Sequence, residues 1–279
     1  MKHTTVVAGL EVQVFTTDAF KTSTKPILAL FVLHGRLGST ESENVRSLIT
    51  TVVKAAGEHE GEKDLMIVAF DHRNHGTRLR SKVANLGFEE NDNHASDMYS
   101  ILAKDVSFLI DFLESYLFPA AERRVVEWGV AGISLGGHSA WMVAAADPRV
   151  TLVVPIIGCP DYLGLIEARA TALGIAIGPP HFPDSLMKVL KAKALTALPY
   201  RSTAGENPFL GKKVLVLSGG SDPVVPWAAS RAFVEGLEVG PRGSKEVKVF
   251  EGVGHAVGQG MVDGLVAFVL GDLACGRMF

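Results

Sequence analysis

The sequence predicts an α/β protein with a mostly parallel sheet and helices on both faces. Three observations favour this fold class. Short apolar runs alternate with segments of helical periodicity along almost the whole chain of 279 residues. The runs at 27–33 and 151–157 are almost entirely apolar, as expected for strands that are covered on both sides. A glycine-rich turn at 132–136 joins an apolar run to a helical segment.

Eight segments are expected to form strands, and the first two form a hairpin around Gly9. They are 4–8, 10–16, 27–33, 65–70, the first part of 126–142, 151–157, 214–217 and 247–250. Apolar residues at helical spacing predict helices between most of them, including one long helix from about 94 to 117.

The stretch 161–210 interrupts this alternation with two helix-like pieces, at 162–173 and 185–197. Its apolar content is too small for a core of its own. We therefore expect residues 1–279 to form one domain, into which 161–210 is inserted as a helical cap.

The composition excludes several classes of protein. Hydrophobic residues make up 47% of the chain and the net charge is -3, without a basic run that would indicate a nucleic-acid partner. No run reaches the roughly 18 apolar residues of a membrane span, and the N-terminus is too short in apolar residues for a signal peptide. Two cysteines, Cys159 and Cys275, form neither a disulfide framework nor a metal motif. We expect a cytoplasmic protein.

Candidate chemistry begins at Gly132-Ile133-Ser134-Leu135-Gly136, a G-x-S-x-G pattern between a strand and a helix. A serine at such a turn has strained backbone, and glycines two residues to either side remove the Cβ atoms that would clash. Its hydroxyl is exposed at a helix N-terminus, which favours developing negative charge. Ser134 is therefore a candidate nucleophile.

A serine nucleophile needs a base, and the base needs a group that holds its tautomer. His255, in Gly254-His255, follows the last expected strand, and Asp222 follows the strand before it. Both lie where the carboxyl ends of parallel strands meet, which is where functional groups gather in such sheets. The order Ser134, Asp222, His255 is the order of α/β-hydrolases.

The chain resembles the α/β-hydrolase superfamily over nearly its whole length. The residues that carry the resemblance are His34-Gly35, Asp71-x-Arg73-x-His75-Gly76, Gly132-x-Ser134-x-Gly136, Asp222-x-Val224-x-Pro226 and Gly254-His255. Within it, Gly136-Gly137-His138 and Gly158-Cys159-Pro160-Asp161-Tyr162 are similar to small serine esterases of the dienelactone-hydrolase and prolyl-oligopeptidase branches. The resemblance implies an oxyanion hole made by the backbone N–H groups of Arg36 and Leu135.

Several residues have alternative interpretations. Asp161 also follows a strand and is the rival to Asp222 as the acid. His72 and His75 have a spacing that allows a metal site, although we favour the interpretation that they belong to a structural turn. The Arg36 side chain either points into the pocket or, as we favour, into solvent. His138 is expected to pack beneath the turn that carries Ser134.

These residues predict a serine hydrolase of the carboxylesterase type that acts on a small acyl substrate and needs no metal or organic cofactor. Tyr162 and Phe182 of the apolar cap are expected to bind the substrate, which would be neutral and moderately hydrophobic. The same residues suit a thioester, lactone, amide or carbon–carbon bond, or a pocket that only binds a ligand. Exposed edge strands would allow a homodimer.

Overall fold

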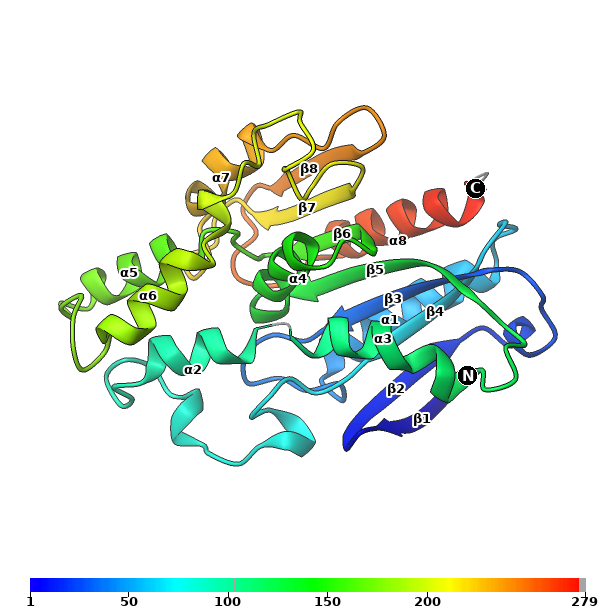
Figure 1. Ribbon diagram of the computed structural model, residues 1–279, viewed down its shortest axis with the longest axis horizontal. Coiled ribbons are helices and arrows are strands. Elements are labelled where there is room, and N and C mark those ends of the chain that lie inside the picture. The colour runs from blue at the N-terminus through cyan, green and yellow to red at the C-terminus, as the bar shows by residue number, and fades with distance from the viewer. Residues whose placement is uncertain (103, 276–279) are drawn as a thin grey trace.

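The computed structural model describes residues 1–102 and 104–275. One sheet of eight strands crosses the molecule in the order β1-β2-β4-β3-β5-β6-β7-β8 (Figure 1). Strands β1 and β2 form the expected hairpin, β2 pairs antiparallel with β4, and all remaining pairs are parallel. The strands are β1 Lys2–Val7, β2 Leu10–Thr16, β3 Ile27–Leu33, β4 Asp64–Ala69, β5 Val125–Ile133, β6 Val150–Ile156, β7 Lys213–Gly219 and β8 Ser244–Phe250. The predicted fold class is confirmed.

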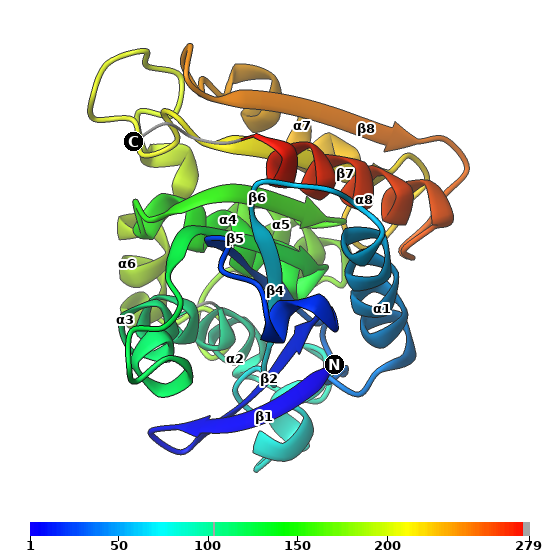
Figure 2. The same ribbon diagram turned by 90° about the vertical axis from the view of Figure 1, so that its right-hand side faces the viewer.

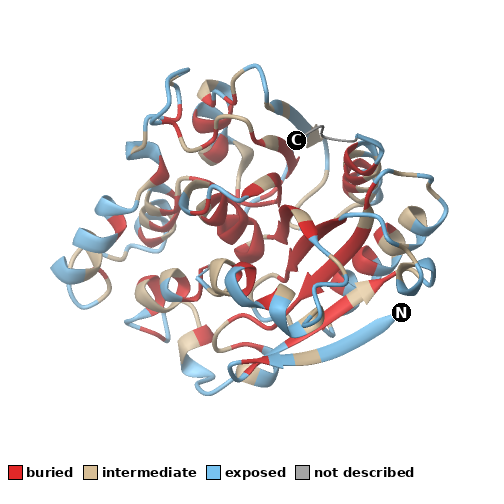
Figure 3. Cartoon of the chain, turned by 45° about the vertical axis from the view of Figure 1, so that its right-hand side comes forward, coloured by how far each residue is buried: buried red, intermediate tan, exposed pale blue. Residues whose placement is uncertain are grey.

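Helices cover both faces of the sheet (Figure 2). On one face, α1 (Glu43–Gly57) and α8 (Gln259–Ala274) share a core with the strands, and on the other face α3 (Asp105–Leu117), α4 (Leu135–Ala146) and α7 (Trp227–Gly236) do so. The central strands are buried, whereas the edge strand β1 is largely exposed (Figure 3). No helix in the described part of the chain is both long and apolar enough to cross a membrane.

The single helix expected over 94–117 is two helices, α2 (His94–Ile101) and α3. The apolar stripe continues through both, but its two halves pack against different partners. Met98 and Leu102 join a cluster beneath the cap, whereas Val106 and Leu109 pack on the sheet. Asp105 at the start of α3 is fixed by ion pairs with Arg73 and Arg78. The apolar residues keep the same helical spacing through both helices, so the sequence does not show that the two halves pack against different parts of the protein.

The segment 161–210 contains α5 (Tyr162–Ala172), α6 (Asp184–Ala192) and a short 3-10 helix, Leu195–Ala197. Helices α5 and α6 lie with α2 beyond the carboxyl ends of the strands (Figure 1) and share a small apolar cluster with it. The end of the segment differs, because Tyr200 and Phe209 pack in the main core against Phe233 of α7. The layer over the site therefore consists of α2, α5 and α6. Three more 3-10 helices are Ala19–Lys21, Gly76–Arg78 and Val83–Asn85.

A buried charge network joins the sheet to α8. Lys63, directly before β4, contacts Glu127 of β5 at 2.5 Å and Asp272 of α8 at 2.7 Å. Lys213 of β7 also pairs with Asp272. Since the side chains of Lys63, Glu127 and Asp272 are at most 5% exposed, their charges depend on each other for neutralisation.

Substitution Lys63→Met removes one cation from two buried carboxylates and should lower the free energy of unfolding by about 3 kcal/mol, measured by urea denaturation at pH 7. The matched charge deletion is Arg231→Met, since Arg231 pairs with Glu235 on the exposed face of α7. It should change stability by less than about 1 kcal/mol. Equal losses in the two variants would contradict a stabilising role for the network.

Candidate functional site

Ser134 occupies the turn between β5 and α4. Its backbone has φ 55° and ψ -109°, a strained conformation for a residue with a side chain. The Ser134 N–H donates to the carbonyl of Ile156 at the end of β6, and its own carbonyl accepts from His138 N–H in the first turn of α4. These two bonds hold the turn from both sides and leave the hydroxyl at the helix N-terminus.

Glycines make this turn possible, as the sequence predicts. A Cβ on Gly132 would lie 2.1 Å from the Gly136 carbonyl oxygen, and one on Gly136 would lie 2.3 Å from the Leu33 carbonyl oxygen. The next glycine, Gly137, approaches Gly158 after β6 equally closely, since a Cβ on Gly158 would lie 2.5 Å from the Gly137 carbonyl carbon. Helix α4 thus begins in direct backbone contact with the loops after β3 and β6.

The structure brings Ser134, His255 and Asp222 together in one line of hydrogen bonds. Ser134 Oγ lies 2.9 Å from His255 Nε2, and His255 Nδ1 lies 2.8 Å from Asp222 Oδ2. The Asp222 side chain is fully buried, and its other oxygen accepts from the N–H groups of Val224 and Val225. An ionised carboxylate only accepts, so His255 carries its proton on Nδ1 and offers Nε2 as acceptor to the serine.

Asp161, the alternative to Asp222 as the acid beside His255, has a structural role. Its carboxylate accepts from Gly164 N–H and caps the N-terminus of α5. The acid that contacts His255 is Asp222.

The backbone N–H groups expected to form the oxyanion hole flank Ser134. Leu135 is the first residue of α4, and Gly35, next to Arg36, lies against the turn, since a Cβ on Gly35 would be 3.6 Å from Ser134 Cβ. Within residues 1–102 and 104–275, no hydrogen bond uses the N–H of Arg36 or Leu135. Both donors therefore remain available to an oxyanion, and their role stays a prediction.

His34 fixes the loop that carries Arg36. Its Nε2 accepts from His72 N–H at 2.9 Å, so its Nδ1 is the protonated nitrogen and donates to the Gly35 carbonyl at 2.7 Å. Burial lowers the pKa of His34 to about 4, which keeps the ring neutral and this tautomer intact at neutral pH.

His72 and His75, the alternative metal site, pack around His34. Their ring centroids lie 4.6 and 5.4 Å from that of His34. His75 Nδ1 donates to the Arg73 carbonyl, and the described residues contain no group of three or more His, Cys, Asp or Glu side chains arranged to hold a metal ion. The cluster supports the turn after β4.

His138 lies beneath the turn, where the sequence predicts it. Its Nδ1 lies 2.9 Å from the Cys159 backbone nitrogen and 3.0 Å from the Cys159 carbonyl oxygen, which ties α4 to the loop after β6. Burial lowers the pKa of His138 to about 4 and raises the pKa of the Cys159 thiol to about 11, so both groups are neutral at pH 7. The hydrogen-bond partner of Ser134 Oγ is His255, and His138 bonds to the Cys159 backbone instead.

A pocket of about 370 Å³ opens above Ser134, and we call it the Ser134 pocket. Its lining includes Arg36, His138, His255 and, from the cap, Arg169. Arg36 thus borders the pocket and is half-buried, whereas the sequence favours a solvent-facing side chain. The sequence does not single out Arg169, because an arginine within a helix has the pattern of an ordinary surface residue.

Tyr162 and Phe182, the expected substrate-binding residues, do not line the Ser134 pocket. Tyr162 is buried and donates its hydroxyl to the Ala95 carbonyl of α2, and Phe182 packs on Phe88 with 1% exposure. Their aromatic rings fill the core between the cap helices and α2. The cap has few other places in which to bury apolar side chains.

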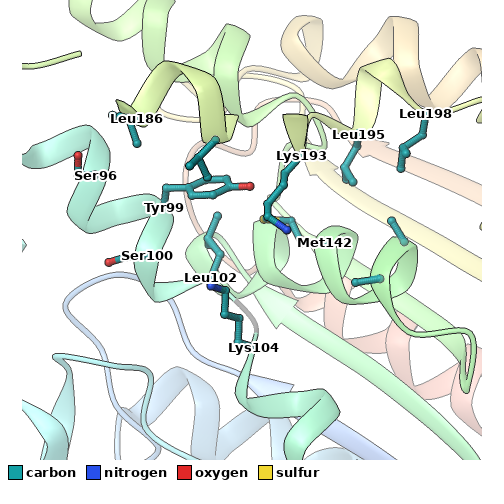
Figure 4. A pocket seen from close by; sticks show the side chains of 13 residues that line it. Ser96, Tyr99, Ser100, Leu102, Lys104, Met142, Leu186, Lys193, Leu195 and Leu198 are labelled. Atoms are coloured by element: carbon teal, nitrogen blue, oxygen red, sulfur yellow. The ribbon is translucent and has the colours of Figure 1, made fainter. Parts of the chain in front are cut away.

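A second cavity, of about 430 Å³, lies between α2, α4 and α6 (Figure 4). Tyr99, Met142, Leu186 and Leu198 give it a mostly apolar lining. Ser134, Asp222 and His255 do not border it. The apolar space under the cap is thus separate from the polar space over the serine.

The fold and the site together define a hydrolase-like class: a mostly parallel sheet with a serine at a strand-to-helix turn and a histidine and a carboxylate on neighbouring loops. The model of the alpha/beta hydrolase family matches residues 30–267. The chain belongs to this family, and the predicted resemblance is confirmed.

Solved structures agree with the fold. TT1662 from Thermus thermophilus has a TM-score of 0.64 and 21% identity and covers 99% of both chains. Est1E from Butyrivibrio proteoclasticus, in a complex with ferulic acid, has a TM-score of 0.60 and 16% identity and covers 98% of this chain and all of its own. The esterase Pf2001 from Pyrococcus furiosus has a TM-score of 0.56 and 19% identity, with 99% and 93% covered. A search of curated proteins found no match.

Substitution Gly136→Ala should lower the free energy of unfolding by at least about 3 kcal/mol, because its Cβ meets the Leu33 and His34 carbonyl oxygens at 2.3 and 2.9 Å. Gly271→Ala is the control, since a Cβ there meets nothing within 4 Å on an exposed position of α8. It should be neutral or slightly stabilising. Urea denaturation measures both, and a Gly136→Ala variant as stable as the parent would refute the close contact.

The buried histidines predict a loss of stability in acid. The unfolded chain binds a proton at His138 below pH ~6.5, whereas the folded chain does so only near pH 4, so stability present above pH ~6.5 is lost as the pH falls to about 4. His138 alone accounts for about 3 kcal/mol of this loss. In His138→Gln, the decrease in unfolding free energy from pH 7 to pH 4 should be smaller by that amount.

The control for this prediction is His3→Gln, since His3 is exposed on β1. It should leave the pH dependence of stability as in the parent. A His138→Gln variant with the parent's acid sensitivity would show that this ring does not titrate with unfolding.

Proposed function

We propose that the protein is a serine hydrolase that cleaves an ester through an acyl-enzyme, as carboxylesterases do. The observation that carries the proposal is the hydrogen-bonded line from Ser134 Oγ to His255 Nε2 at 2.9 Å and from His255 Nδ1 to Asp222 Oδ2 at 2.8 Å. The esterase Pf2001 among the structural neighbours supports the choice of an ester.

In this mechanism His255 Nε2 takes the proton of Ser134 as Oγ attacks the ester carbonyl carbon. The carbonyl oxygen becomes an oxyanion, which accepts hydrogen bonds from the backbone N–H groups of Arg36 and Leu135. His255, now a cation, is stabilised by the buried carboxylate of Asp222 and returns the proton to the leaving alcohol oxygen. This breaks the carbon–oxygen bond and leaves the acyl group on Ser134.

Water completes the cycle by the same steps. His255 takes a proton from the water as its oxygen attacks the acyl carbon, the oxyanion forms in the same position, and the proton returns to Ser134 Oγ. The product acid leaves and the serine is free again. Both half-reactions exchange atoms only among the ester, the water and the side chains of Ser134 and His255.

The hydrogen bonds around the site explain why its members stay in place. The N–H groups of Val224 and Val225 orient Asp222, and His34 holds the loop of Arg36 against the loop after β4. We further propose that α5 and α6 act as the cap that limits access to the Ser134 pocket.

Ser134→Ala should reduce hydrolysis of p-nitrophenyl esters to the uncatalysed background, because no other group replaces the nucleophile. Asp222→Asn should lower kcat by about 10³- to 10⁴-fold, since the amide favours the wrong tautomer of His255. Steady-state kinetics on esters of increasing acyl length measure both.

The control is Ser139→Ala, since Ser139 lies on the same helix, is buried and has no hydrogen-bond partner for its hydroxyl among the described residues. It should retain the parent's kinetics. Labelling by a fluorophosphonate probe should occur in the parent and in Ser139→Ala and be absent in Ser134→Ala. Undiminished ester hydrolysis in Ser134→Ala would refute the assignment, and a parent that neither hydrolyses esters nor labels would favour a ligand-binding role.

A further inference from the structure

The Ser134 pocket has an uneven charge. Two arginines line it, Arg36 from the loop after β3 and Arg169 from α5 of the cap. Of the described residues that line the pocket, none is Asp or Glu. The carboxylate of Asp222 lies behind His255, has no exposed surface and is used by the histidine and by two backbone N–H groups. The space over the serine is therefore cationic.

Neither arginine has an acidic partner. Among the ion pairs formed by residues 1–102 and 104–275, none includes Arg36 or Arg169. By contrast, Arg73 and Arg78 on the loop after β4 share the carboxylate of Asp105. Burying a cation that has no ion-pair partner costs free energy. The presence of two such arginines beside Ser134 therefore calls for an explanation.

A structural role accounts for only some of the N–H donors of Arg169. One of its terminal nitrogens donates to the Val224 carbonyl at 2.7 Å, which links the cap to the loop that carries Asp222. A guanidinium has five N–H donors, so this bond leaves most of them free. Arg36 makes no side-chain hydrogen bond to another described residue. Both arginines border the Ser134 pocket, whose described lining includes no carboxylate.

The two arginines also repel each other. Burial is the main cause that lowers the pKa of each guanidinium. At Arg169 the positive charge of Arg36 adds to the lowering, and the buried carboxylate of Asp222 partly opposes it. Both groups stay charged at neutral pH because an arginine pKa is so high. An anion that enters the pocket would relieve this repulsion and pair with both forks.

We propose that the Ser134 pocket selects esters that carry an anionic group, a carboxylate or a phosphate, which Arg36 and Arg169 bind. The proposal rests on the serine hydrolase function and specifies its substrate class. Guanidinium forks match both anions through paired N–H donors, and the volume of about 370 Å³ calls for a small substrate with the anion a short distance from the scissile carbonyl. This replaces the neutral, hydrophobic substrate that the apolar sequence of the cap predicts.

The test compares two p-nitrophenyl esters of equal reach, the glutarate half-ester with a free carboxylate and its methyl ester. In the parent, kcat/KM should be about 10- to 100-fold higher for the carboxylate than for the neutral ester, as expected for charge-assisted hydrogen bonds. In Arg169→Gln and in Arg36→Gln, this ratio should fall about tenfold. Arg169→Gln also removes the hydrogen bond to the Val224 carbonyl, because the glutamine side chain ends two atoms short of the arginine terminal nitrogen. Arg36→Gln tests the charge without that loss.

Two further variants separate charge from structure. Arg169→Lys should recover part of the ratio, because it restores the charge without the fork. Arg231→Gln, on the exposed face of α7, should leave the ratio as in the parent. A parent that prefers the neutral ester, or a ratio that is unchanged in both arginine-to-glutamine variants, would overturn the proposal.

Calorimetric titration of Ser134→Ala with monomethyl glutarate, dimethyl glutarate and inorganic phosphate tests the anion site without turnover. Monomethyl glutarate should bind, dimethyl glutarate should bind at least tenfold more weakly, and Arg169→Gln in the same background should abolish the difference. Stronger binding of inorganic phosphate than of monomethyl glutarate would identify phosphate as the anion.

The two readouts separate the two proposals. A protein that hydrolyses neither ester but binds monomethyl glutarate through Arg169 refutes the esterase and supports the anion site. A protein that hydrolyses the neutral ester through Ser134 and binds neither anion refutes the anion site alone.

Discussion

The contact between backbone atoms around Ser134 is the constraint on which the rest of the site depends. Gly132, Gly136 and Gly137 bring the start of α4 so close to the ends of β3 and β6 that no Cβ fits between them. This contact fixes the left-handed backbone of Ser134 and places its hydroxyl, with the free N–H of Leu135, at the carboxyl edge of the sheet. A looser turn would leave the serine without a defined direction towards His255.

Buried polar bonds extend this rigidity to the neighbouring loops. His34 joins the loops after β3 and β4, His138 joins α4 to the loop after β6, and Asp222 gathers the N–H groups of its own loop. Each of these side chains is almost fully enclosed, so each bond lies in a medium of low dielectric constant, where its geometry is strongly held. The histidines do this as neutral rings, which burial ensures by lowering their pKa.

The cap divides its apolar and polar residues between two spaces. Tyr162 and Phe182 complete a small core with α2, and an apolar cavity lies beside that core (Figure 4). The contribution of the cap to the Ser134 pocket is instead the guanidinium of Arg169, anchored on the Val224 carbonyl. The layer formed by α2, α5 and α6 has little apolar area, and most of that area is buried in the contacts that hold the layer on the domain.

The fold class and the approximate positions of the strands follow from the sequence, as does the prediction that Ser134, Asp222 and His255 share one site. These features depend on local patterns: apolar runs, a glycine spacing imposed by backbone clashes, and the placement of loops at one edge of a parallel sheet. Three features depend on the tertiary structure: 94–117 is two helices, Tyr162 and Phe182 are core residues, and Arg36 and Arg169 line the same pocket as Ser134. Which face of an amphipathic helix meets which neighbour is set by long-range packing, and no period within the helix records it.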